Sequence, residues 1–231
     1  MNDSNSSRER ASLIGVCGTA ATKETAELLI KVAEDLGDAE MKKVALSAIG
    51  RVGALWGDGS YHEERAPVLD RAWRASNDQG LLIFVAEAMA QVGAPSSVEL
   101  LLSAALSDDK KGDARKRAAE EALTKVHTNN ALPAVVALLE NQSSVNQSTV
   151  LACNMLVRIG DAESGRVLME WIRKADKSVA PAVSTFVMGT RTPEILDAWG
   201  AAIDARVSFK SEENREMIAR ALKEYRDGIA H

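Results

Sequence analysis

The chain has 231 residues, of which 46% are hydrophobic and only 4% are aromatic. This hydrophobic content is typical of a folded globular protein and is too high for a disordered one. The 28 basic and 33 acidic residues give a formal charge of -5 at pH 7, so no excess of positive charge is present to bind nucleic acid. Alanine occurs 37 times, and such an alanine-rich, aromatic-poor composition favours closely packed helices over a β-sandwich.

Two further features of the composition predict the compartment. Cys17 and Cys153 are far apart in sequence and are predicted to be free thiols in a reducing environment. No apolar run approaches the roughly 20 residues that a helix needs to cross a bilayer. The run at 11–21 follows two arginines as in a signal peptide, but it is short, contains two glycines and leads directly into a helical pattern. We therefore predict a cytoplasmic protein with no membrane partner.

The organisation along the chain is that of consecutive helices. Residues 1–10 begin with a polar stretch and are predicted to form a disordered tail, followed by a single domain over 11–231. Beyond the tail, apolar residues recur three and four positions apart, which predicts amphipathic helices, and no stretch alternates as a strand would. The predicted helices cover 22–36, 39–55, 65–75, 78–92, 95–107, 112–127, 130–141, 145–159, 161–175, 177–189, 192–206 and 211–228.

Four of these helices end in the same pattern. A small or apolar residue and a large apolar residue are followed by two variable positions, a β-branched residue and usually a glycine. The β-branched positions recur every 33 to 40 residues, at Val52, Val92, Val126 and Ile159. The following glycine is predicted to end the helix in the left-handed conformation, at Gly53, Gly93 and Gly160, while His127 takes this place in the third copy.

This repeated phrase, Ala-Leu/Ile-x-x-Val/Ile-Gly followed by a connector and a leucine-containing helix, resembles the short bacterial HEAT repeat first noted in phycobilisome lyases. The resemblance covers about residues 22–206. It implies an all-α fold, a right-handed α-α superhelix or armadillo-like solenoid of about six antiparallel helix pairs. One such pair cannot bury its own apolar face, so the pairs must stack. The family includes lyases, scaffolds and DNA-repair proteins, so the resemblance predicts architecture and not activity.

By analogy with the family, the second helix of each pair lines the concave face of the superhelix. Aligning the repeats places one mostly basic row on that face, made of Arg51, Gln91, Lys125 and Arg158. This row is a candidate surface for an acidic or extended partner protein. The alternative is an ordinary solvated helix face with ion pairs four residues apart, such as Glu121–Lys125.

The connector at 56–64 is the longest and most glycine-rich, and it is a second candidate surface. It contains Trp56 and Tyr61, and aromatic side chains on loops often dominate binding. Alternatively, the two rings fold back on the helices beneath them. His62 is not predicted to bind a metal, because no second cluster of ligands supports it. Three tryptophans on predicted first helices are expected to be core residues, namely Trp73, Trp171 and Trp199.

No set of residues converges on an active site, and we predict no catalytic residue, no metal and no cofactor. The sequence favours a non-enzymatic scaffold or interaction module that binds another protein through its concave face or the 56–64 connector. Two alternatives remain open. One is an accessory enzyme of the lyase type, which needs a deep pocket with convergent polar groups. The other is an immunity or inhibitor protein.

Overall fold

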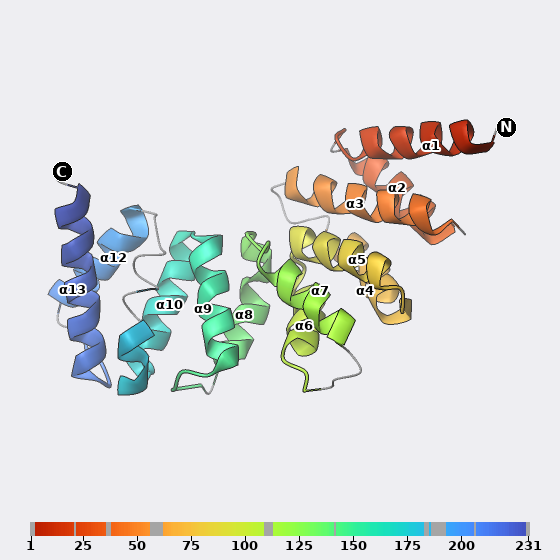
Figure 1. The fold of residues 1–231 in the computed structure, drawn as a ribbon. Helices are drawn as coiled ribbons and strands as arrows, with labels where there is room; N and C mark the ends of the chain where they lie inside the picture. Colours follow the sequence, from red (N-terminus) through yellow and green to blue (C-terminus); the bar gives the residue numbers. More distant parts are fainter. Residues whose placement is uncertain are drawn as a thin grey trace. The chain divides into compact units, whose positions relative to one another are not determined.

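A computed structural model describes the chain except residues 1–2, 21, 36–37, 56–61, 109–112, 141, 183–184, 186–192, 206 and 230–231. Most of the described residues are helical and none of them lies in a strand, so the predicted all-helical class is confirmed. The contacts within the chain form two compact units, Met1–Ala131 and Leu132–His231. Each unit is described by itself (Figure 1).

The first unit contains seven labelled α-helices in its described part. They are α1 (Asp3–Cys17), α2 (Lys23–Asp35), α3 (Ala39–Leu55), α4 (His62–Ala75), α5 (Gln79–Val92), α6 (Pro95–Ala105) and α7 (Asp113–Leu123), followed by the 3-10 turn η2 (Asn129–Ala131). Odd-numbered helices pack one against the next, α1 on α3, α3 on α5 and α5 on α7, and α2, α4 and α6 form a second row. Contacts of α2 with α3, α4 with α5 and α6 with α7 join the two rows.

The apolar stripes of these helices meet between the two rows. The largest apolar side chains that are fully buried there are Leu29, Leu46, Ile49, Leu69, Met89, Leu101 and Leu123. Small residues allow the odd-numbered row to pack closely, since Ala45, Ala48, Ala86, Ala88 and Ala90 are also buried. The alanine-rich composition therefore serves the packing of helix against helix.

Helix α1 differs from the expected polar tail. It begins at Asp3 and packs on α3, although residues 1–10 are predicted to be disordered. Arg8, Glu9, Arg10 and Ala11 are good helix formers without an apolar stripe, so periodicity gave no signal for a helix here. Farther along α1, Leu13 is 67% exposed.

The predicted glycine stops hold at two helices and fail at a third. Gly93 and Gly160 have φ of 66° and 67°, and each caps its helix by donating its N–H to a carbonyl one turn earlier, Met89 O and Leu156 O. For α3 the predicted range 39–55 is confirmed, whereas the glycine stop predicted at Gly53 is wrong, because the helix continues to Leu55. A glycine inside a helix costs about 1 kcal/mol relative to alanine, which neighbouring helix formers can offset.

The second unit contains α8 (Leu132–Leu139), α9 (Gln147–Ile159), α10 (Ala162–Lys174), the 3-10 turn η3 (Lys177–Val179), α12 (Pro193–Asp204) and α13 (Glu212–Ile229). Helix α10 is central to this unit, since it contacts α8, α9, α12 and α13. The buried apolar side chains include Met155, Leu156, Leu168, Ile172, Trp199 and Ile218. Trp171 and Trp199 are both buried, as is Trp73 in the first unit, which confirms their assignment to the core.

Leu156 provides a test of this core. Its side chain is 1% exposed on α9, so Leu156→Ala should lower the free energy of unfolding by about 2–5 kcal/mol, the range for buried leucines. Leu13→Ala is the matched control, because removing an exposed leucine should change stability by less than about 0.5 kcal/mol. Urea unfolding followed by circular dichroism measures both. Equal effects of the two substitutions would contradict this placement of Leu156.

Cys153 is buried on α9, while Cys17 is partly exposed on α1, and neither forms a disulfide. Burial raises the pKa of the Cys153 thiol from 9.0 to about 12, because the thiolate would lose its hydration. The folded protein therefore keeps this thiol protonated and unreactive.

A thiol count follows from this pKa. Ellman's reagent at pH 8 should modify one thiol of the native protein, Cys17, and both thiols after denaturation in urea. Above about pH 9 only the unfolded chain releases the Cys153 proton, so this group lowers stability progressively as the pH rises toward about 12. Rapid modification of both thiols in the native protein would contradict the burial of Cys153.

Candidate interaction surface

The first unit contains three of the four residues of the predicted basic row, on or next to successive odd-numbered helices. Arg51 is exposed on α3, Gln91 is partly buried on α5, and Lys125 is exposed just beyond α7. The side chain of Gln91 lies against Gly50 of α3. Because α3 contacts α5 and α5 contacts α7, these three positions follow the same row of helices.

Lys125 is bound by carboxylates of its own unit. Its Nζ donates to Glu87 of α5 and lies 3.6 Å from an oxygen of Glu121. The hydrogen bond to Glu87, followed by the charges of both carboxylates, raises the pKa of Lys125. The Glu121–Lys125 pair expected of a solvated helix face is therefore present, and a partner would have to compete with both carboxylates for Lys125.

The other predicted residues do not belong to the described part of the first unit, apart from His62. Arg158 is exposed on α9, in the second unit. Trp56 and Tyr61 lie outside the described residues, so the loop surface stays a prediction. His62 is the first residue of α4.

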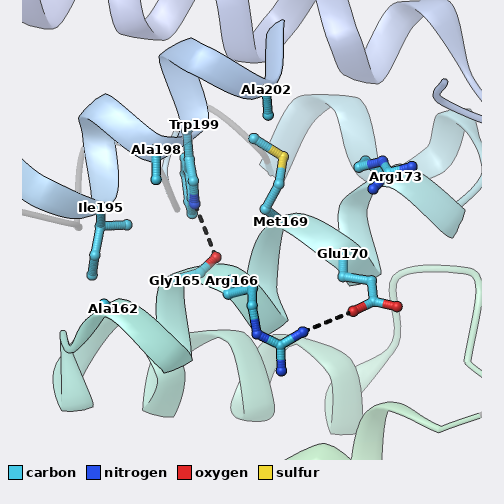
Figure 2. A pocket seen from close by; sticks show the side chains of 10 residues that line it. All are labelled: Ala162, Gly165, Arg166, Met169, Glu170, Arg173, Ile195, Ala198, Trp199 and Ala202. Carbon is cyan, nitrogen blue, oxygen red and sulfur yellow. Dashed lines mark hydrogen bonds and ion pairs between the residues drawn. The ribbon is translucent and has the colours of Figure 1, made fainter. Parts of the chain in front are cut away.

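A hollow of about 300 Å³ lies between α10 and α12 of the second unit (Figure 2). Apolar groups form most of its lining, and Arg166, Glu170 and Arg173 supply the charged groups. The indole Nε1 of Trp199, on α12, donates to the carbonyl of Gly165, on α10, at 2.9 Å. The remaining lining residues are Ala162, Met169, Ile195, Ala198 and Ala202.

The close approach of α12 to α10 depends on Gly165. A Cβ at this position would lie only 2.9 Å from Cγ1 of Ile195, which is itself buried. The side chain of Ile195 therefore packs directly on the backbone of α10 at Gly165. This contact and the Trp199 hydrogen bond hold the two helices at the separation that leaves the hollow open on one side.

A second hollow, of about 450 Å³, lies at the C-terminal end of α10. It shares Glu170 and Arg173 with the first hollow and adds Lys174, Ser208, Phe209 and Lys210. The segment before α13 is tied to α10 here, since Arg173 Nε donates to the Ser208 carbonyl at 3.2 Å and the Lys210 N–H donates to the Arg173 carbonyl at 2.8 Å.

Asn214, buried at the start of α13, donates hydrogen bonds to backbone carbonyls at the C-terminal end of α10. Its side-chain nitrogen lies within hydrogen-bonding distance of three carbonyls, Ile172 at 3.3 Å, Ala175 at 3.2 Å and Asp176 at 3.1 Å. The last carbonyls of a helix have no partner within the helix and must find donors elsewhere. One amide group therefore supplies donors to the end of α10 and fixes α13 beside it.

The charged ridge along α10 is largely paired internally. Arg166 donates to Glu163 at 2.9 Å and to Glu170 at 3.3 Å, and Lys174 donates to Glu170 at 2.7 Å. The hydrogen bond from Arg166 lowers the pKa of Glu163, and that from Lys174 is the largest cause of the lowered pKa of Glu170. Both carboxylates therefore stay ionised at neutral pH.

Sequence patterns did not single out these two hollows. The buried tryptophans and the pair Arg173–Lys174 were visible, but a cationic residue in the last turn is an ordinary feature of a helix end. The hollows form because α12 and the 208–210 segment pack on α10, and periodicity within one helix does not report such a contact.

Two searches of the described structure concern other kinds of site. The described residues include no group of three or more His, Cys, Asp or Glu side chains arranged to hold a metal ion. None of the helices described is both long enough and apolar enough to cross a membrane.

Comparison with known proteins assigns no family. No protein-family model matches the chain, and the curated proteins contain no match to it.

Asn214 gives a stability test at the C-terminal end of α10. Asn214→Ala should lower the free energy of unfolding by about 1–3 kcal/mol, because buried carbonyls lose their donor. Asn214→Asp should cost more at pH 7, where a carboxylate would face three carbonyl oxygens. It should recover part of that loss near pH 4, as the new carboxyl group takes up a proton.

Asn154→Ala, at an exposed position of α9, is the control for these two variants and should leave urea unfolding nearly unchanged. If Asn214→Asp were as stable as the native protein at pH 7, Asn214 could not be the donor to the end of α10.

Proposed function

We propose that the chain is a HEAT-like helical-repeat module that binds another protein and carries out no catalysis of its own. The observation that supports this most directly is the alternating contact pattern of the first unit, in which α1, α3, α5 and α7 form one row and α2, α4 and α6 the other. A right-handed superhelix of stacked antiparallel pairs is the architecture that we infer from this pattern and from the repeats in the sequence. Such modules bind partners through side chains from several repeats.

The ionisable groups favour binding over acid–base chemistry. A general acid or base needs a pKa shifted toward the working pH. In this chain the resolved shifts of described carboxyl groups are all downward and those of lysine and arginine are all upward, with a side-chain hydrogen bond as the largest cause each time. The groups concerned are Glu163, Glu170, Asp176, Glu213, Lys43, Lys125 and Arg166. These shifts are those of surface ion pairs and hydrogen-bonded caps, and they keep each group charged.

The row on the first unit is the surface that we propose for the partner. Arg51 lies on α3 and Lys125 just beyond α7, on the two sides of α5 in the odd-numbered row, and both are exposed. A partner carboxylate at this row would meet a guanidinium at Arg51 and would share Lys125 with Glu87. Such contacts set specificity and association rate more than folding stability, since exposed ion pairs contribute only about 0–1 kcal/mol to the fold.

The test removes these two positive charges. Arg51→Gln combined with Lys125→Gln should weaken capture of the partner at least tenfold, which corresponds to about 1.4 kcal/mol, and should leave the melting temperature within a few degrees. Glutamine is chosen because it places no new carboxylate beside Glu87 and Glu121. The partner is first identified by mass spectrometry after affinity capture from cells that produce the protein, and its affinity is then measured with purified components.

Lys31→Gln combined with Arg74→Gln is the control, because these exposed residues lie on α2 and α4, in the other row. It removes the same charge and should leave capture unchanged. Equal affinity of both double variants would remove the row from the proposal, and failure to capture any specific partner would count against the interaction function itself.

A further inference from the structure

Two of the hollows on the second unit, the one between α10 and α12 and the one at the C-terminal end of α10, form one continuous surface with two chemical halves. Glu170 and Arg173 line both of them, so they meet along the last turns of α10. The half between α10 and α12 has an apolar lining that includes Met169, Ile195 and Trp199. Its volume of about 300 Å³ is at the small end of ligand pockets, which suits one large apolar side chain.

The other half carries positive charge. Together the two linings contain four cations and one carboxylate, namely Arg166, Arg173, Lys174, Lys210 and Glu170. Arg166 and Lys174 both pair with Glu170, and Glu163 also pairs with Arg166. Arg173 and Lys210 form no ion pair within 4 Å with any described residue, although Arg173 contributes to the lowered pKa of Glu170 and Lys210 to that of Asp176.

These cations are not needed to neutralise the end of α10. Lysine and arginine near a helix end often serve its unpaired carbonyls. Here Asn214 donates to the carbonyls of Ile172, Ala175 and Asp176, and the Lys210 N–H donates to that of Arg173. Arg173 uses its Nε on the Ser208 carbonyl. Its two other guanidinium nitrogens and the Lys210 ammonium form no hydrogen bond with a described residue, so they can bind an anion outside the chain.

We propose that this surface is a docking site for an acidic peptide segment with one large apolar anchor residue. The anchor enters the hollow between α10 and α12, and carboxylates within a few residues of it contact Arg173 and Lys210. Phe209 adds an apolar group to the lining of the second hollow. This proposal rests on the interaction function proposed above, and it assigns a second surface with its own chemistry.

A peptide suits this surface better than a free small molecule. Small-molecule pockets bury most of their ligand, whereas here two adjoining hollows lie open on one side of α10 and differ in chemistry. A chain segment can place an apolar side chain in one and carboxylates over the other. The charge contacts should weaken as salt is added, because exposed charges are screened at high ionic strength.

The probe is a displayed library of random 12-residue peptides, selected on the intact chain. The expected result is enrichment of peptides with one large apolar residue and at least two acidic residues within four positions of it. The best peptide, labelled with fluorescein, is then measured by polarisation at low and high salt. Arg173→Glu combined with Lys210→Glu should weaken its binding at least tenfold, and so should Ala198→Trp, which fills the apolar hollow from an exposed lining position.

Two controls match these variants. Arg220→Glu with Lys223→Glu makes the same charge change at exposed positions of α13, and Ala201→Trp adds the same ring to an exposed position of α12 outside the hollow. Both should bind the peptide as the native chain does. No enrichment, enrichment without acidic residues, or binding that the hollow variants leave intact would overturn the docking site.

The two proposals fail separately. If the cellular partner is still captured by the Arg173→Glu/Lys210→Glu and Ala198→Trp variants, and no peptide depends on the hollows, the docking site is wrong while the interaction function stands. If no partner is captured, the interaction function fails whatever the peptide experiment shows.

Discussion

The ends of the helices impose the requirement on which much of this structure depends. The last carbonyls of each helix need donors from outside it, and in both units donors come from a later part of the chain. Arg115 of α7 donates to the backbone carbonyl of Ser76, just beyond the end of α4, at 2.7 Å. Its guanidinium also lies 4.8 Å from the centre of the Trp73 ring. Trp171 of α10 donates to the Gln142 carbonyl beyond α8, and Asn214 serves α10. These bonds join helices that the chain does not connect directly, and they fix how the helices stack.

The sequence predicted the helices well because the signals for them are local. Apolar spacing within one helix located α2 to α10, and the left-handed glycines at 93 and 160 ended two of them as expected. The predictions that are wrong concern features that the spacing of apolar residues within one helix does not report. The polar stretch of α1 has no apolar stripe of its own, and the helix packs against α3. The repeated pattern predicts a helix stop at Gly53, but Ala54 and Leu55 continue the helix.

Because sequence signals are local, they predicted some residues of the candidate sites but not the contacts between helices. Aligning repeats placed Arg51, Gln91 and Lys125 on successive helices, and α3, α5 and α7 do form one row. The alignment did not reveal that Glu87 of α5 binds Lys125, because that pair joins two helices. The hollows beside α10 were invisible for the same reason, since they require α12 and the 208–210 segment to meet one helix face.

The row on the first unit and the surface at the end of α10 differ in how far their cations are paired with carboxylates of the chain itself. Lys125 is paired with two carboxylates of its own unit, so a partner gains there only by replacing or joining an existing ion pair. At the end of α10, Asn214 and a backbone N–H donate to the carbonyls that side-chain cations would otherwise serve. Within the described part of the chain Arg173 donates only its Nε, to the Ser208 carbonyl, and it lies with Lys210 beside an apolar hollow. An anchor residue that enters this hollow gains free energy from leaving water, while the cations select acidic neighbours for it. The hydrogen bonds from Asn214 stabilise this helix end, and because they do so, Arg173 and Lys210 can contribute to recognition of a partner at the same place.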